Sequence, residues 1–148
     1  MQLLILLAVA LMAGAAASLQ VGVNIRLREW AGDPVAAAFV SFLVGTVTLA
    51  AYMLATRIPW PQIDGASRLP LWHWSGGVLG AFIVASTVIV APRLGAATTL
   101  SLMVAGQMLT ALALDHFALF GYPQHTASPL RMLGIALIVA GVIVIRRF

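Results

Sequence analysis

Long runs of apolar residues, separated by short segments rich in proline, glycine and charge, make up most of the 148-residue sequence. A helix of about 20 apolar residues can cross the hydrocarbon core of a bilayer, which is about 30 Å thick. Runs of this length predict membrane-spanning helices at about residues 2–25, 35–56, 73–91, 96–115 and 129–145. The pattern therefore predicts one all-α integral membrane domain over residues 1–148, with its two ends on opposite sides of the membrane.

Local signals mark where these helices begin and end. Asp33 followed by Pro34 pairs a residue that caps helix N-termini with a proline suited to the first helical position. Residues 57–72 form the longer polar loop, and flanking tryptophans indicate that it lies at a membrane interface. Pro92 and Gly95 predict a tight turn between the third and fourth spans.

Composition agrees with a membrane protein, since 62% of the residues are hydrophobic and 8% are charged. Soluble domains are about one quarter charged. All positive side chains are arginines beside or between the apolar runs, so no basic patch for nucleic acid is formed and membrane lipid is the expected surroundings. The absence of lysine excludes a Walker-type ATP site in this chain, and the absence of cysteine excludes disulfides.

The arginines divide almost evenly between the two sides of the predicted membrane domain. One side carries Arg26, Arg28, Arg93, Arg146 and Arg147, and the other carries Arg57, Arg68 and Arg131. This weak bias favours an outside N-terminus and an inside C-terminus, but it would also let the chain insert in both orientations. Two oppositely inserted copies would form an antiparallel dimer of ten helices, an inverted-repeat arrangement common among secondary transporters.

Polar residues inside the apolar runs are the candidates for solute binding. Gln20 and Asn24 lie four residues apart and share one face of the first helix, and Gln107 lies within the fourth. Ser41 and Thr46 add hydroxyl groups on the second span. Such groups either line a cavity and bind a solute or hydrogen-bond to a neighbouring helix, and the sequence leaves both interpretations open.

Asp115 is the acidic residue nearest a span, so it is a candidate ion or proton site. The alternative is a residue at the helix end, paired with an arginine such as Arg131, because a carboxylate at a helix C-terminus is unfavourable without a partner. His73, His116 and His125 come from separate segments without helical metal-ligand spacing, so no metal site and no cofactor are predicted.

Small residues recur along the predicted spans and would let helices approach closely. The predicted packing positions are Gly14, Ser18, Gly22, Gly45, Gly76, Gly77, Gly80 and Gly106. The three glycines at residues 76–80 could also let the third span bend during alternating access.

A series of short motifs runs through nearly the whole chain in a familiar order. These motifs are Gln20-xxx-Asn24, Asp33-Pro34, Ser41-Phe42-xx-Gly45-Thr46, Gly76-Gly77-xx-Gly80-Ala81, Pro92-Arg93-Leu94-Gly95-Ala96, Gly106-Gln107 and Asp115-His116-Phe117. Together they resemble the YdcZ-type family, small five-span proteins of the drug/metabolite transporter superfamily. The resemblance implies a bacterial inner-membrane protein whose functional unit contains two inverted five-helix halves.

The small multidrug resistance proteins, more distant in resemblance, use a membrane-embedded glutamate in the first span, and this sequence has no acidic residue there. We therefore expect a secondary transporter subunit, not an enzyme, that moves a small neutral or weakly polar solute. The alternative is an accessory membrane protein whose polar helix face binds partner helices. A membrane enzyme using Asp115 and His116 ranks last, because neither a nucleophile nor a metal motif accompanies them.

Overall fold

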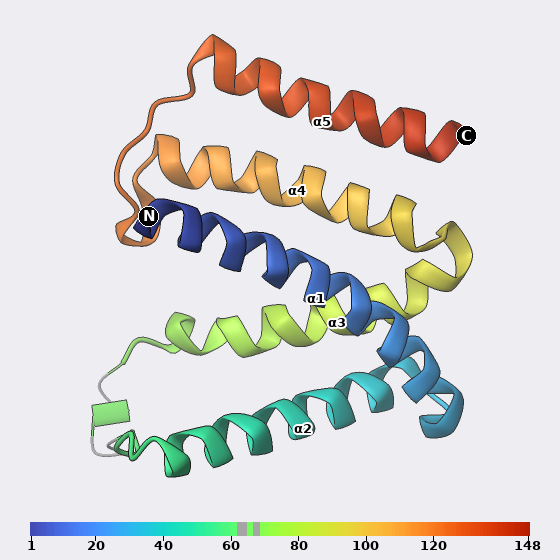
Figure 1. The fold of residues 1–148 in the computed structure, drawn as a ribbon, viewed down its shortest axis with the longest axis vertical. Coiled ribbons are helices and arrows are strands. Elements are labelled where there is room, and N and C mark those ends of the chain that lie inside the picture. The colour runs from blue at the N-terminus through green and yellow to red at the C-terminus, as the bar shows by residue number, and fades with distance from the viewer. Residues whose placement is uncertain (62–64, 67–68) are drawn as a thin grey trace. The chain divides into compact units, whose positions relative to one another are not determined.

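A computed structural model of the chain describes residues 1–61, 65–66 and 69–148 (Figure 1). Its long helices are α1 (Gln2–Ala31), α2 (Pro34–Ala55), α3 (Ser75–Leu94), α4 (Ala96–His116) and α5 (Pro129–Arg147). Single-turn 3-10 helices precede α3 (η2, Leu71–Trp74) and follow α4 (η3, Leu119–Gly121). Each long helix could cross a membrane by length and composition, which confirms the predicted all-helical class with five candidate spans. Residues 62–64 and 67–68 of the predicted polar loop, Arg68 among them, lie outside the described residues.

The first two helices are joined by a sharp turn whose ends are fixed by specific residues. α1 continues beyond the predicted end near residue 25 and stops before Gly32, which has a left-handed backbone (φ 77°) that glycine adopts readily. The Asp33 carboxylate accepts hydrogen bonds from the backbone N–H groups of Val35 (2.7 Å) and Ala36 (3.2 Å). The helix start predicted at Asp33-Pro34 is thus confirmed.

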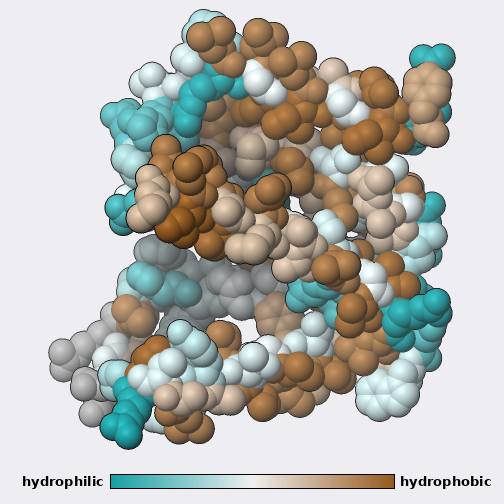
Figure 2. All heavy atoms as spheres, viewed as in Figure 1, coloured by the Kyte–Doolittle hydropathy of each residue, from teal (hydrophilic) through white to brown (hydrophobic). Residues whose placement is uncertain are grey.

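The chain forms two compact units, Met1–Pro92 and Arg93–Phe148. In the first, α1 packs on α2, and successive helices run in opposite directions (Figure 1). In the second, α4 packs on α5 as an antiparallel hairpin. Apolar side chains are exposed along the helices of both units (Figure 2), as expected for surfaces that face lipid or another subunit in a membrane.

The end of α3 differs from the sequence prediction. Pro92 was expected to open a turn, but the helix continues through it to Leu94, and the chain breaks at Gly95 (φ 83°). Because proline has no N–H, the carbonyl four residues earlier, that of Val88, loses its helical donor. Helices in membranes accept such a proline when another group satisfies the freed carbonyl.

Arg28 supplies that group from the last turn of α1. Its Nη1 donates to the carbonyl oxygen of Val88 at 3.5 Å, and Val88 is fully buried. The positive guanidinium also lies near the C-terminal end of α1, where the helix dipole favours a cation. Arg28 therefore ties α1 to α3 at the point where Pro92 interrupts the helical hydrogen bonds.

Replacing Arg28 by methionine is expected to lower the free energy of unfolding by about 1 kcal/mol, because the buried Val88 carbonyl loses its donor. In a Pro92→Ala background the loss should shrink, since an N–H at residue 92 can then serve the same carbonyl. Unfolding of the purified protein in detergent micelles, titrated with sodium dodecyl sulfate, measures both values.

Arg26 offers a matched control because it forms an exposed ion pair with Glu29 (3.1 Å) two residues before Arg28. Arg26→Met should change stability little in either background. Equal losses for Arg28→Met with and without Pro92 would contradict the assigned role.

Candidate polar groove and ion pair

A groove between α1 and α2 contains three of the predicted solute-binding residues. Gln20 lies on the α1 side and Ser41 and Thr46 on the α2 side, and the cavity has a volume of about 230 Å³. Phe42, Gly45 and Leu49 complete its lining. Residues four apart on a helix share one face, so Ser41, Gly45 and Leu49 follow one line along α2.

The groove presents hydrogen-bonding groups without formal charge. The Gln20 amide carries both donors and an acceptor, and the Ser41 hydroxyl can act as either. The Thr46 hydroxyl donates to the Phe42 carbonyl of its own helix at 2.9 Å, which leaves its oxygen free to accept. Gly45 adds width, because a Cβ at that position would meet nothing within 4 Å. This arrangement suits an uncharged solute with a hydroxyl or amide group.

The other two predicted solute-binding residues do not line this groove. Asn24 is buried, with 2% of its surface exposed, whereas Gln20 one turn earlier is exposed. Gln107 is an exposed residue of α4, in the second unit. A role in solute binding for Asn24 and Gln107 stays a prediction.

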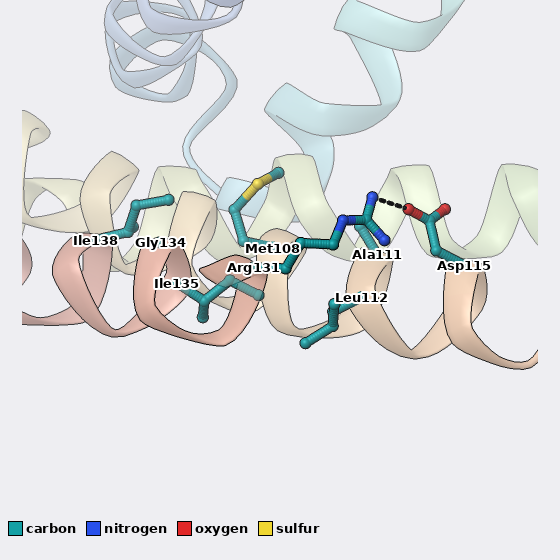
Figure 3. Close-up of a pocket in the computed structure, with 8 residues that line it drawn as sticks. All are labelled: Met108, Ala111, Leu112, Asp115, Arg131, Gly134, Ile135 and Ile138. Atoms are coloured by element: carbon teal, nitrogen blue, oxygen red, sulfur yellow. Dashed lines mark hydrogen bonds and ion pairs between the residues drawn. The ribbon is translucent and has the colours of Figure 1, made fainter. Parts of the chain in front are cut away.

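In the second unit, Asp115 and Arg131 form an ion pair between α4 and α5. Arg131 Nη2 lies 2.7 Å from Asp115 Oδ2, which confirms the pairing predicted for a helix-end aspartate (Figure 3). Arg131 Nη1 also donates to the carbonyl of His125 (3.0 Å), and the His125 N–H donates to the carbonyl of Asp115 (3.0 Å). The pair thereby fastens the α4–α5 connection to the two helix ends.

The ion pair lies at one end of a largely apolar cavity of about 340 Å³ (Figure 3). The rest of the lining is Met108, Ala111, Leu112, Gly134, Ile135 and Ile138. An ion or proton at Asp115 would compete with the Arg131 guanidinium, and such a role stays a prediction. Among the described residues, no three histidine, aspartate or glutamate side chains form a group that could hold a metal.

A protein-family model matches residues 5–144 of the chain. The matching family is described as "Putative inner membrane exporter, YdcZ". The chain belongs to this family. Comparisons with curated proteins and with solved structures give no significant match. Membership confirms the resemblance seen in the sequence motifs and assigns this YdcZ-family protein to transport at the inner membrane.

Most glycines of this YdcZ-family protein have no neighbouring side chain close to the position that a Cβ would take. Added Cβ atoms at Gly14, Gly22, Gly45, Gly76, Gly77 and Gly106 would each meet nothing within 4 Å. Ser18, in the same stripe as Gly14, is exposed and its hydroxyl donates to the Gly14 carbonyl (3.2 Å). At Gly80 a Cβ would lie 3.1 Å from Cζ of Phe42, so this glycine accommodates an aromatic ring. Close helix packing at the other glycines stays a prediction.

Phe42 is the residue that sequence reasoning did not select. It lines the polar groove and also contacts the Gly80 position across to α3. The available signal was an aromatic residue set among small residues, next to Ser41 and three positions before Gly45. That signal is weak, because the contact with Gly80 joins residues far apart in the sequence.

Reversing the ion pair should test whether Asp115 acts mainly through Arg131. In this YdcZ-family protein we expect Asp115→Arg or Arg131→Asp alone to lower stability by about 1 kcal/mol, because both side chains are partly exposed and the pair is screened by solvent. The double exchange should recover most of that loss. Thermal unfolding in detergent micelles gives the comparison, and a double variant no more stable than the single ones would exclude the pairing as the main role.

Proposed function

We propose that this protein is the subunit of a secondary transporter that moves a small, neutral or weakly polar solute by alternating access. The polar groove with Gln20, Ser41 and Thr46 is the observation that carries the proposal. It places uncharged hydrogen-bonding groups within membrane-spanning helices, where polar groups commonly mark a solute pathway. Family membership indicates transport at the inner membrane, and the groove supports the proposed class of solute.

The absence of ionised side chains from the groove lining argues for an uncharged solute. A charged molecule entering the groove would lose its hydration without gaining a counter-ion, which costs several kcal/mol. A hydroxyl or amide group would instead exchange water for the Gln20, Ser41 and Thr46 side chains. The groove therefore favours neutral amphiphiles over the organic cations that carboxylate-based exporters bind.

An antiparallel homodimer is the proposed functional unit. With five spans and a near-even distribution of arginines, both orientations of the chain can insert. The open glycine positions of α1 and α2 provide surfaces on which another helix could pack closely. An inverted partner would pack against these surfaces and complete a site between the two halves, which alternating access could expose to each side in turn.

A pair of threonines in α2 provides a matched test of the groove. Thr46 and Thr48 both donate to the carbonyl four residues earlier (2.9 and 2.8 Å), but Thr46 lines the groove and Thr48 does not. Energised cells producing the protein should accumulate less of the neutral dye N-phenyl-1-naphthylamine than vector cells. Thr46→Val should weaken that efflux about two- to tenfold through loss of one hydrogen bond, whereas Thr48→Val should leave it unchanged.

Tetraphenylphosphonium, a permanent cation, serves as the second probe and should show no protein-dependent efflux. Equal effects of Thr46→Val and Thr48→Val would contradict the groove as the solute site. Wild-type cells that retain the neutral dye like vector cells would contradict transport of this class and favour the accessory role.

The orientation of the chain in the membrane can be measured with one introduced cysteine, because the sequence contains no cysteine that would react in its place. A single cysteine added after Phe148 should react with an impermeant maleimide in about half of the molecules in intact spheroplasts, and in all of them after lysis. Complete reaction or complete protection in intact spheroplasts would show one fixed orientation and contradict the antiparallel homodimer.

A further inference from the structure

A second cavity lies next to the polar groove along α2 and shares Phe42 with it. It lies between α2 and α3, has a volume of about 370 Å³, and is lined by Val35, Ala38, Phe39, Phe42, Ala81 and Ala85. Every one of these side chains is apolar. The groove and this apolar cavity thus differ in chemistry while sharing one helix.

Phe42 belongs to both linings and is the residue that they share. The tip of its ring approaches Gly80 of α3, where a Cβ would lie only 3.1 Å from Cζ. A larger residue at position 80 would therefore displace the Phe42 ring, which lines both spaces.

The two spaces follow each other along α2. The α2 residues that line the apolar cavity lie between Val35 and Phe42, and those that line the groove lie between Ser41 and Leu49. At about 1.5 Å per residue, the apolar cavity is nearer the capped Asp33 end and the groove is nearer the middle of the helix. A membrane lipid has the opposite order, with its polar head at the interface and its chains toward the middle. Lipid is thus a poor occupant of the combined site.

We propose that the groove and the apolar cavity are the two halves of one binding site for an amphiphile. Its uncharged hydroxyl or amide head hydrogen-bonds in the groove, and its compact apolar body passes Phe42 into the cavity between α2 and α3. This inference rests on the proposed function and defines the solute class of the same site. Phe42, with Gly80 behind it, is the residue that selects how large the apolar body can be.

Photolabelling of the purified full chain in nanodiscs tests the arrangement. The probe is octanol carrying a diazirine on its terminal carbons, and unlabelled octanol is the competitor. Labelling at residues 81–85 should saturate with probe and be displaced by the competitor, because a defined cavity holds a limited number of molecules. Octanoate carrying the same diazirine should give no saturable label there, because its charged head finds no counter-ion in the groove lining.

Ala81→Phe should lower the saturable label about tenfold by filling the cavity. Val78→Phe, at an exposed α3 position outside the linings of both spaces, adds the same side chain and should leave the label unchanged. Thr46→Val should raise the half-saturating probe concentration about two- to tenfold, and Thr48→Val should not. Ala85→Leu provides a milder filling variant should Ala81→Phe fail to yield folded protein.

Label that does not saturate, or that responds equally to Ala81→Phe and Val78→Phe, would overturn the two-part site and indicate lipid-like association. The proposed transport function would still stand if dye efflux depended on Thr46 in that case. Conversely, saturable label at residues 81–85 without dye efflux would support the two-part site and remove the transport role. The two proposals therefore fail on different measurements.

Discussion

Every backbone polar group inside a membrane needs a partner from the protein, and this requirement shapes the chain more than any other. Regular helices meet it, and α3 departs from it at Pro92, where the Val88 carbonyl is left without a helical donor. Arg28 restores the hydrogen bond from another helix. A proline that would otherwise weaken α3 thus lies beside a hydrogen bond that joins α1 to α3, and Val88 and Ala91 are both buried there.

The threonine hydroxyls of α2 differ in whether they face a cavity in addition to bonding their own helix. Thr48 and Thr56 donate to carbonyls of their own helix and line no described cavity. Thr46 makes the same local bond but faces the groove together with Gln20 and Ser41. Thr46 therefore differs from Thr48 and Thr56 in facing an open space, and this difference is the reason that it is proposed to bind solute.

The sequence predicts the helices well because apolar run length and local capping residues act over short distances. The Asp33 cap and the Asp115–Arg131 pair are of this kind, since each depends on a helix end and a nearby partner. The contacts of Arg28 with Val88 and of Phe42 with Gly80 could not be predicted, because they join different helices far apart in the sequence. The separation of Gln20 from Asn24 has the same cause. Their spacing places them on one helical face, but neighbouring helices decide which is buried.

The length of α1 has a consequence for the lipid around the protein. Its 30 residues extend about 45 Å, well beyond a hydrocarbon core of about 30 Å. Its last turns carry the exposed ion pair of Arg26 and Glu29, which belongs in the headgroup region. The helix must therefore lean or project from the membrane, and thicker or thinner bilayers would change that tilt. Because Gln20 lies on this same helix, acyl-chain length becomes a physical variable that acts on the shape of the groove.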